Sequence, residues 1–504
     1  MDLPAPIGPC HVGGVSLPST EALRDLAAVT AHRCGVPTAS LTGDGIARTP
    51  ITGGTIAAVG RAEPADVDAA VRSAREGFVT WCDTLPLERA RILRSVGAIL
   101  RAHAEELALL DAIDCGNPVA EMSSDIMVAA ALFDFFAGLV TELKGDSIPM
   151  GPEAINFTVR EPLGVVARIV AFNHPFLFAA GKMAAPLAAG NTVVVKPPEQ
   201  APLSSIRMME LFADIFPAGV LNCVNGDRDA GAALVSHPLV AKVALTGGEQ
   251  AGKAVLHAAA DQIKPTLLEL GGKNALVVYP DADMEAAVSG AVRGMNFLWA
   301  GQSCGSTSRV YVHESIHDAF LERFVAGISA AHRPGLPEDP ATTMGCLGHK
   351  NAFDKTMYYI ETALAEGARL VLGGKRPDDP RLANGWFVEP TVFADVRSDM
   401  RVAQEEIFGP VVVVIKWSDE DKLIEEVNAL NYGLTCSIWT RDLDTAIAAA
   451  HRVEAGYVWI NGSSSHAIGA PFGGYKRSGL GREECLEELF EFTQVKNINI
   501  ARRP

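Results

Sequence analysis

The sequence lacks any sign of paired cysteines. Its nine cysteines are scattered over 504 residues, their number is odd, and no two of them form a Cys-x-x-Cys pair. This pattern fits neither a disulfide framework nor a structural zinc site, and it is typical of proteins from a reducing compartment. We therefore predict a cytoplasmic protein without a bound metal.

Long apolar runs and a secretory signal are missing as well. Every apolar stretch approaching the ~18 residues of a membrane span is interrupted by Lys, Arg, Glu, Asn or Pro, so no span is predicted. The first residues, Met1-Asp2-Leu3-Pro4, show no basic region followed by an apolar run. The expectation is a soluble, intracellular protein.

Positive charge is scarce. The 43 Lys and Arg residues stand against 60 Asp and Glu residues, which gives a formal net charge of −17. Nucleic-acid binding and docking on an anionic membrane both depend on clustered positive charge, so the balance argues against these two classes. The expected partners are small molecules and other copies of the chain.

The length exceeds what one hydrophobic core usually supports, so two or three domains are expected. Helical periodicity appears at residues 19–33, across residues 64–104, where Pro64 suits a first helical turn, and at residues 127–139.

From Leu163 onward, short apolar strands alternate with helices. Such alternation predicts an α/β fold with a parallel sheet covered on both faces. The predicted elements of the first unit are strand 165–171, helix 178–189, strand 192–195, helix 204–216, strand 220–222, a short helix from Ala230, strand 243–245 and helix 250–260. A second α/β unit begins with strands 276–278 and 309–312, helix 318–331 and strand 410–415, and it continues past Trp439.

Two segments near the junction of these units suggest covalent catalysis. Cys304 ends the tetrapeptide Gly301-Gln302-Ser303-Cys304, and Glu269 lies in Leu268-Glu269-Leu270-Gly271-Gly272-Lys273. A cysteine among small residues suits a nucleophile, and a glutamate beside two glycines suits a base that activates water. Clefts between domains are common small-molecule sites.

Three further segments fit the same chemistry, although each has a plain structural alternative. Thr246-Gly247-Gly248 follows a strand and opens a helix, which suits a phosphate group but also an ordinary turn. Lys196 and Glu199 follow another strand, where they suit ribose hydroxyls or form a solvated turn. Asn173 could donate to an oxyanion or cap the following helix, and both roles are compatible.

Together these motifs resemble the NAD(P)-dependent aldehyde dehydrogenase superfamily, over nearly the whole chain from about Thr52 to Ile500. The landmarks are Phe172-Asn173-x-Pro175, Lys196-Pro197-Pro198-Glu199, Thr246-Gly247, Glu269-Leu270-Gly271-Gly272-Lys273, Gly301-Gln302-x-Cys304, Glu406-Ile407-Phe408-Gly409-Pro410 and Pro471-Phe472-Gly473-Gly474-x-Lys476-x-Ser478-Gly479.

The resemblance implies a Rossmann-type cofactor domain, an α/β catalytic domain and a small oligomerisation element. We assign residues 1–142 and 163–269 to the first, with residues 1–50 as an atypical extension, residues 270–485 to the second, and residues 143–162 and 486–504 to the third. A homodimer or homotetramer is implied.

The implied reaction is oxidation of an aldehyde to its carboxylic acid. Cys304 would form a thiohemiacetal and then a thioester, Asn173 would hold the oxyanion, and Glu269 would activate the hydrolytic water. Lys182 and Glu483 would form a proton relay.

The implied cofactor is NAD rather than NADP, because a carboxylate at Glu199 would repel a 2′-phosphate. The resemblance places eleven residues at the cofactor: Phe172, Lys196, Glu199, Gly231, Thr246, Gly247, Gly248, Gly252, Leu270, Glu406 and Phe408.

The substrate positions suggest a bulky or aromatic aldehyde with a polar group. They are His174, Phe178, Gly181, Leu298, Ser303, Gly305, Ser464, His466 and Phe472. Gly181 and Gly305 suggest a roomy tunnel, whereas His174 and His466 either recognise a polar group or only fill the wall.

Two alternatives remain open at this point. A CoA-acylating dehydrogenase of the same fold would form a thioester product, but a water-activating Glu269 argues against it. A catalytically silent homologue is the other, and it need not keep Cys304, Glu269 and Asn173.

Overall fold

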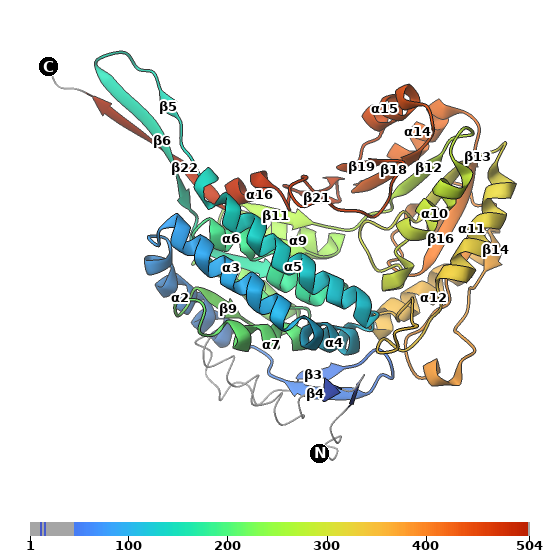
Figure 1. The fold of residues 1–504 in the computed structure, drawn as a ribbon, viewed down its shortest axis with the longest axis horizontal. Coiled ribbons are helices and arrows are strands. Elements are labelled where there is room, and N and C mark those ends of the chain that lie inside the picture. Colours follow the sequence, from blue (N-terminus) through green and yellow to red (C-terminus); the bar gives the residue numbers. More distant parts are fainter. Residues whose placement is uncertain (1–10, 13–14, 17–44, 502–504) are drawn as a thin grey trace.

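The fold is described from a computed structural model, which describes residues 11–12, 15–16 and 45–501. The helix predicted at residues 19–33 lies outside the described residues. Two large sheets and a projecting three-stranded sheet organise the chain (Figure 1).

The first large sheet has six strands in the order β21-β11-β10-β7-β8-β9. All neighbours pair in parallel except β21, which runs antiparallel to β11. The strands are β7 (Val165–Ile169), β8 (Thr192–Lys196), β9 (Leu221–Cys223), β10 (Val240–Thr246), β11 (Thr266–Glu269) and β21 (Gly479–Leu480). The predicted parallel sheet of the first unit is therefore confirmed.

Helices cover this sheet, and α2 (Pro64–Trp81) illustrates why they form. Pro64 occupies the first turn, where its missing N–H costs nothing, and Asp66 completes a capping box with Glu63. Apolar residues at helical spacing, such as Val67, Ala70 and Val71, are buried against the sheet. The other helices of this half are α3 (Pro86–Ala102), α4 (Ala104–Cys115), α5 (Val119–Leu139), α7 (Leu203–Phe212), α8 (Arg228–Ser236) and α9 (Glu249–Ala260).

Helix α5 is strongly apolar, although no membrane span was predicted from the sequence. With the short 3₁₀ turn Val140–Glu142 it is long and apolar enough to cross a membrane, by length and composition alone. In the fold it packs against α3 and α4, and Ile126, Phe133 and Phe136 are buried in the core of the first half. The burial of α5 in the core of the first half thus accounts for its apolar composition.

Several predicted helix boundaries were wrong because of proline. The periodic stretch 64–104 is two helices, since α3 starts anew at Pro86. Helix α7 ends at Phe212 rather than 216, ahead of Pro217, which disfavours helix in the preceding residue. The helix predicted at 178–189 is a π-helical turn, Leu177–Gly181, followed by α6 (Ala184–Ala188), because Pro186 cannot donate to the carbonyl of Lys182.

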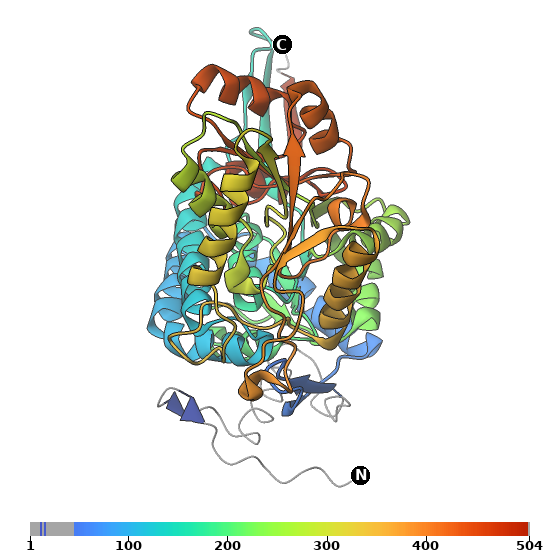
Figure 2. The ribbon, with the colours of Figure 1, turned by 90° about the vertical axis from the view of Figure 1, so that its right-hand side faces the viewer.

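The second large sheet has seven strands in the order β14-β15-β16-β13-β12-β18-β19, which are parallel except for β14. They are β12 (Ala275–Val278), β13 (Arg309–His313), β14 (Arg369–Leu372), β15 (Thr391–Ala394), β16 (Val411–Trp417), β18 (Thr435–Trp439) and β19 (Tyr457–Ile460). The helices of this half are α10 (Met284–Gly294), α11 (His317–Ala331), α12 (Lys350–Ala365), α13 (Arg401–Gln404), α14 (Glu420–Asn428) and α15 (Leu443–Arg452). In Figure 2 the yellow and orange elements of this half face the viewer.

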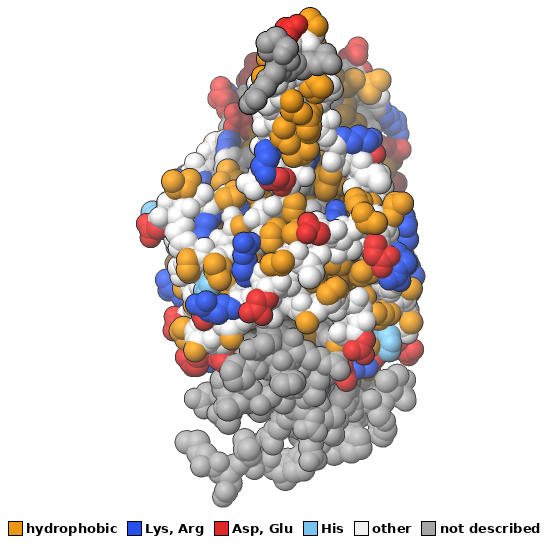
Figure 3. All heavy atoms as spheres, turned by 90° about the vertical axis from the view of Figure 1, so that its left-hand side faces the viewer, with side chains coloured by type: hydrophobic (Ala, Val, Ile, Leu, Met, Phe, Trp, Pro, Cys, Tyr) orange, Lys and Arg blue, Asp and Glu red, His pale blue; other side chains and the backbone are white. Residues whose placement is uncertain are grey.

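A three-stranded antiparallel sheet projects from the first half (Figure 1). It consists of β5 (Ser147–Ile148), β6 (Ala154–Pro162) and β22 (Thr493–Ala501), and β22 pairs with β6 along its whole length. Its exposed apolar side chains include Ile148, Ile155, Val495 and Ile500. Hydrophobic side chains gather on this arm in the space-filling view (Figure 3).

Two elements lie in a different sheet or core from the one that the predicted division of the chain suggests. Helix α16 (Leu486–Glu491), assigned to the oligomerisation element, buries Leu489 in the core of the first half. Strand β21, assigned to the catalytic part, pairs with β11 in the first sheet. The division into cofactor, catalytic and oligomerisation domains itself stays a prediction.

The remaining elements are short. They are the pairs β1 (His11–Val12) and β2 (Val15–Ser16), β3 (Gly45–Arg48) and β4 (Thr55–Val59), β17 (Tyr432–Gly433) and β20 (Tyr475–Lys476), and the 3₁₀ turns Phe297–Trp299 and Pro380–Leu382.

Candidate active site

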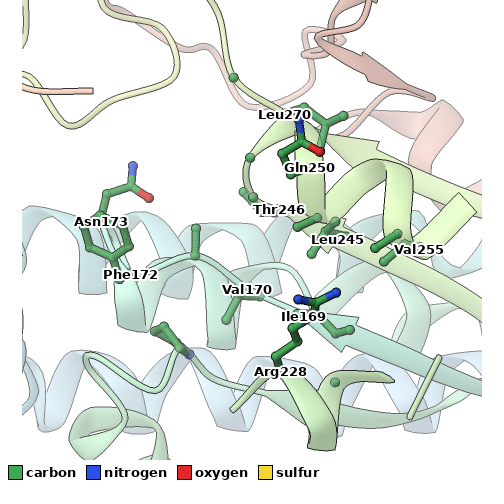
Figure 4. A pocket seen from close by; sticks show the side chains of 18 of the residues that line it. Ile169, Val170, Phe172, Asn173, Arg228, Leu245, Thr246, Gln250, Val255 and Leu270 are labelled. Carbon is green, nitrogen blue, oxygen red and sulfur yellow. The ribbon is translucent and has the colours of Figure 1, made fainter. Parts of the chain in front are cut away.

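A cleft of about 1150 Å³ opens at the carboxyl ends of the first sheet and reaches to the second half. Ligands of open α/β sheets bind at this edge because the strand ends and the helix starts converge there. Figure 4 shows Phe172 and Asn173 at one side of the cleft and Thr246, Gln250 and Leu270 at the other. Both Glu269 and Cys304 line it.

The backbone before Cys304 is fixed by close packing. Gly301 has φ +70°, and a Cβ there would lie 2.3 Å from the carbonyl oxygen of Gly409, so only glycine fits. Gln302 is buried, donates to the carbonyls of Trp299 and Cys346, and accepts from the Gly348 N–H. The loop therefore holds its shape without a bound ligand.

Asn274 holds Cys304 from the other side. Its Nδ2 donates to the carbonyl oxygen of Cys304 at 2.6 Å and to that of Ser306 at 3.0 Å, and its Oδ1 accepts from the Thr435 N–H. In the described part of the chain, the Cys304 N–H and the side-chain amide of Asn173 donate no hydrogen bond. Both donors are therefore available for an oxyanion.

The surroundings of the Cys304 thiol disfavour its ionised form. Burial and then the carboxylates of Glu269 and Glu406 raise the pKa of Cys304 to about 12. A thiolate is the reactive form, so the site needs a compensating positive charge or proton acceptor at the moment of attack.

Glu269 ends strand β11 and is 4% exposed. Neither of its carboxylate oxygens has a hydrogen-bond partner among the described residues. Burial and then the charge of Glu483 raise the pKa of Glu269 well above its ordinary value, against the opposing effect of Lys182. Burying a carboxyl group without a hydrogen-bond partner costs free energy. A group in this state suits a general base that takes a proton from a water molecule.

Lys182 and Glu483 form a buried ion pair with Arg168. Glu483 accepts from Lys182 Nζ at 2.6 Å and from Arg168 at 2.6 Å, and all three side chains are almost fully buried. Burial opposes the charge of Lys182, but Glu483 and Glu484 outweigh it and raise the pKa of Lys182. Burial likewise opposes the charge of Glu483, and Lys182 and Arg168 overcome it, so the pKa of Glu483 is lowered.

Side chains from α4, α5 and their connection clamp the segment that carries Asn173. Asn117 Nδ2 donates to the Asn173 carbonyl at 2.9 Å, and Asp111 accepts from the Phe176 N–H at 3.0 Å. Asp125 lies 2.7 Å from His174 Nδ1. Two of these contacts fix the backbone at Asn173 and at Phe176, and the third fixes the His174 side chain between them.

The cofactor residues Lys196, Glu199 and Gly231 lie at or just after the end of β8 and on α8. Lys196 is buried and its Nζ donates to the Pro197 carbonyl at 3.2 Å, whereas Glu199 is exposed and accepts from Gln200 Nε2. Burial lowers the pKa of Lys196, an effect that the charge of Glu199 opposes. Gly231 lies over the Lys196 side chain, where a Cβ would sit 3.6 Å from Cδ.

The phosphate-side residues are arranged as an anion site. Gly248 is the N-cap of α9 without a side-chain cap, and the Thr246 hydroxyl is buried without a partner. The start of a 12-residue helix presents free N–H groups and the positive end of its dipole. Thr246, Gly247, Gly248 and Leu270 line the cleft. Gly252 does not, because it packs α9 against the Leu270 side chain.

Glu406 and Phe408 line the opposite end of the same cleft. Glu406 accepts from the Gly272 N–H at 2.9 Å, and a Cβ at Gly271 would meet the Glu406 carboxylate at 2.2 Å. Phe172 stacks edge-on against Phe408 at 6.0 Å and against His349 at 4.8 Å. The orphan Thr246 hydroxyl, the open helix start and the size of the cleft fit a dinucleotide.

The predicted substrate residues divide into two groups. Phe178 lines the cleft with Cys304, and Gly305 is open, since a Cβ there would meet nothing closer than 3.9 Å. Four further positions contact other parts of the protein. The Leu298 carbonyl accepts from the Gly345 N–H, Ser464 donates to Asn296, and the rings of His466 and Phe472 pack on each other at 4.3 Å. Ser303 borders a small cavity of about 10 Å³.

One expectation about the tunnel was wrong. Gly181 does not leave room, because a Cβ there would lie 2.8 Å from Leu132 Cδ1 and 3.3 Å from Leu177. The expected space is filled by Leu132 of α5 and by Leu177. Only Gly305 supports a wider tunnel.

Sequence reasoning missed the residues that hold others in place. Asn117 and Asn274 act on the active-site backbone, Asp125 acts on the His174 side chain, and Gln250, His349 and Lys355 line the cleft. Asn274 directly follows a motif that was noticed, and Gln250 lies two residues after another. The others come from distant helices, and nothing local marks them.

A nucleotide-sized cleft with a thiol and an unpartnered carboxyl at one end fits an enzyme that combines a dinucleotide with a cysteine nucleophile. The chain matches the aldehyde dehydrogenase family over residues 43–498. Aldehyde dehydrogenase tropH from Talaromyces stipitatus is 51% identical over 458 residues, which cover 90% of this chain and 89% of tropH.

Two solved structures give the same result. The NAD+ complex of aldehyde dehydrogenase from Bacillus cereus is 38% identical, with a TM-score of 0.88 over 91% of this chain and 93% of that one. A mutant of the P. syringae AldA indole-3-acetaldehyde dehydrogenase in complex with NAD+ and IAA is 35% identical, with a TM-score of 0.88 over 90% and 93% of the two chains. The chain belongs to the aldehyde dehydrogenase family, so the predicted family, fold class and enzyme class are confirmed.

The buried ion pair generates a stability prediction. Glu483→Gln removes the carboxylate that contacts both Arg168 and Lys182 at 2.6 Å and leaves them only the longer contacts with Glu488 at 3.7 Å and Glu484 at 3.4 Å, so we expect the free energy of unfolding to fall by about 3 kcal/mol. The midpoint of urea unfolding measures the loss. Glu161→Gln, at the exposed pair with Lys496, is the matched control and should change little. Equal midpoints for the two variants would contradict the assigned role of Glu483.

The raised pKa of Cys304 generates a second prediction. In the cofactor-free protein, alkylation of Cys304 by iodoacetamide should speed up about tenfold per pH unit from about pH 7 to about pH 9, because the thiolate fraction still rises there. The Cys304→Ala variant supplies the background from the other thiols. A rate that has already reached its plateau near neutral pH would contradict the argument.

Proposed function

We propose that the protein oxidises an aldehyde to its carboxylic acid with NAD, through a thioester on Cys304. The observation that carries the proposal is the convergence of Cys304, Glu269 and Asn173 on the dinucleotide-sized cleft. The Glu269 carboxyl group has no hydrogen-bond partner among the described residues, which suits a general base that binds a water molecule.

NAD is the proposed cofactor because the cleft fits a dinucleotide and because two of the compared structures are NAD+ complexes. Lys196 and Glu199 would bind the adenosine ribose, the start of α9 the pyrophosphate, and Glu406 with Phe408 the nicotinamide side. Glu199 at the mouth favours NAD over NADP, since its carboxylate repels a 2′-phosphate. When bound, oxidised NAD supplies the hydride acceptor and a positive charge in the cleft that also holds Cys304.

The chain's own residues carry the remaining chemistry. The Cys304 thiolate attacks the aldehyde carbon, and the resulting oxyanion accepts hydrogen bonds from the Asn173 amide and the Cys304 N–H. Collapse of this thiohemiacetal with loss of hydride leaves the thioester. Asn274, Asn117 and Gln302 keep the donors in place during these steps.

Hydrolysis depends on Glu269. Its carboxylate takes a proton from water, the hydroxide attacks the thioester carbon, and the acid leaves as the thiolate reforms. The buried pair of Lys182 and Glu483 could pass the proton outward, since Glu483 influences Glu269 electrostatically and Lys182 also contacts Glu484 at 3.4 Å.

The proposed substrate is a bulky or aromatic aldehyde with a polar group. Support comes from Phe178 in the cleft, from the contacts of His174 with Phe178 and Trp299, and from the open position at Gly305. The P. syringae relative is named for an aromatic aldehyde.

We further propose a homodimer or homotetramer that forms through the projecting sheet. The antiparallel strands β6 and β22 expose the side chains of Ile155, Val495 and Ile500. Contact between these apolar side chains and water is unfavourable, so a second copy of the chain would bury them. A cytoplasmic location stays a prediction.

The first test is NADH formation with a panel of aldehydes, from short aliphatic to hydroxylated aromatic, in the absence of CoA. The wild-type protein should turn over at least part of the panel, and Cys304→Ala should show no measurable NADH formation, because the nucleophile is lost. Turnover by Cys304→Ala would remove the nucleophile assignment. Turnover that requires CoA would instead favour an acylating enzyme, and silence with and without CoA a catalytically silent homologue.

Glu269→Gln separates the two half-reactions. We expect a burst of NADH equal to the enzyme concentration, followed by a steady state slowed about 100-fold, because deacylation lacks its base. The wild-type steady-state rate should rise with pH, since the raised pKa of Glu269 keeps it protonated at lower pH, and the variant should lose this rise. Deacylation at the wild-type rate in the variant would mean that another base operates.

A further inference from the structure

His174 is held in one orientation by a buried acid. Its Nδ1 lies 2.7 Å from Asp125 Oδ2, and the two side chains are only 13% and 7% exposed. Asp125 comes from helix α5, while His174 directly follows Asn173 after strand β7. The contact therefore joins two distant elements next to the expected oxyanion donor.

The imidazole lies among aromatic rings, one of which lines the cleft that holds Cys304. Its centroid is 5.2 Å from that of Phe178, which lines the cleft with Cys304, and 5.1 Å from that of Trp299. The Trp299 carbonyl accepts from the N–H of Gln302, two residues before Cys304. The Trp299 indole N–H is buried and has no partner within the described residues. The His174 ring thus packs against Phe178, a side chain that lines the cleft together with Cys304.

The contact with Asp125 also sets which imidazole nitrogen carries the proton. A carboxylate only accepts, so Nδ1 donates to it, and in the neutral ring Nε2 is left as an acceptor. Within residues 45–501 no group hydrogen-bonds Nε2. Glu121, one turn earlier on α5, is itself an acceptor when ionised and does not contact the ring. The free side of His174 therefore suits a ligand that donates.

We propose that the His174–Asp125 pair selects aromatic aldehydes that carry a hydroxyl group, whose O–H donates to His174 Nε2. This inference rests on the proposed function and names its substrate class.

The second histidine of the predicted substrate set differs in each respect. His466 is 38% exposed, its Nδ1 contact with Glu484 is 3.3 Å, and its ring stacks on Tyr457 and Phe472. Glu484 is also bound to Lys182, so it orients His466 less strictly. The pair at His174 is the more buried and the better fixed.

The test compares benzaldehyde with its hydroxy and methoxy derivatives at each ring position, at a pH where the phenols are un-ionised. A methoxy oxygen accepts but cannot donate, so at one position the hydroxy compound should exceed both benzaldehyde and its methoxy analogue in kcat/KM by about tenfold. The gain should lie mainly in KM, because the contact is remote from the reacting carbon. In His174→Phe, which keeps an aromatic ring, the ratios of kcat/KM for the hydroxy compound over its methoxy analogue and over benzaldehyde should fall to about one.

Two further variants sharpen the result. Asp125→Leu frees the ring tautomer and should reduce the same preference, and His451→Phe, an exposed histidine on α15, is the matched control. Thermal melting checks that each variant folds. Equal kcat/KM for hydroxy and methoxy compounds in the wild type, or an unchanged preference in His174→Phe, would overturn the proposal. So would an equal loss of all aldehydes in His174→Phe, which would mean that the residue only positions Asn173.

The panel separates this proposal from the proposed function. Turnover of aliphatic aldehydes without any aromatic one would overturn the substrate inference alone. Absence of turnover with every aldehyde would overturn both.

Discussion

The buried charges of Arg168, Lys182 and Glu483 are the constraint on which the site depends. Arg168 belongs to a central strand of the first sheet, Lys182 follows the π-helical turn, and Glu483 comes from the C-terminal segment. Each charge would be expensive alone in the interior, so the three segments have to meet. Where they meet, the charge of Glu483 adds to the effect of burial, and together they raise the pKa of Glu269. The same contact thus joins three segments around the site and contributes to the raised pKa of its base.

The position of the site follows from the way the chain crosses between its two large sheets. Strand β11 ends at Glu269, the segment up to Asn274 passes Glu406 and Cys304, and β12 begins at Ala275. The absence of a side chain at Gly271 lets Glu406 approach. A few residues of backbone therefore hold Glu269, the loop of Cys304 and the cofactor residue Glu406 close together. Their short connection leaves them little freedom to separate.

Sequence reasoning placed the parallel strands and most helices because their apolar periodicity is local. It also placed Cys304, Glu269, Asn173, Lys196 and Thr246, which the structure brings to one cleft, because each lies in a motif at a strand end or helix start. It failed at Gly181, where Leu132 of α5 fills the expected space, and it missed Asp125 and Asn117. The surroundings of these residues depend on contacts between segments that are far apart in the chain, and a local sequence pattern does not predict such contacts.

The central claim is that Cys304 carries the substrate as a thioester. The most direct measurement is peptide mapping by mass spectrometry of the wild-type protein, acid-quenched during turnover with a good aldehyde substrate and NAD. The account predicts that the peptide containing Cys304 gains the mass of the acyl group and that the peptides of the other cysteines do not. An adduct on another residue, or turnover without any adduct on Cys304, would contradict it.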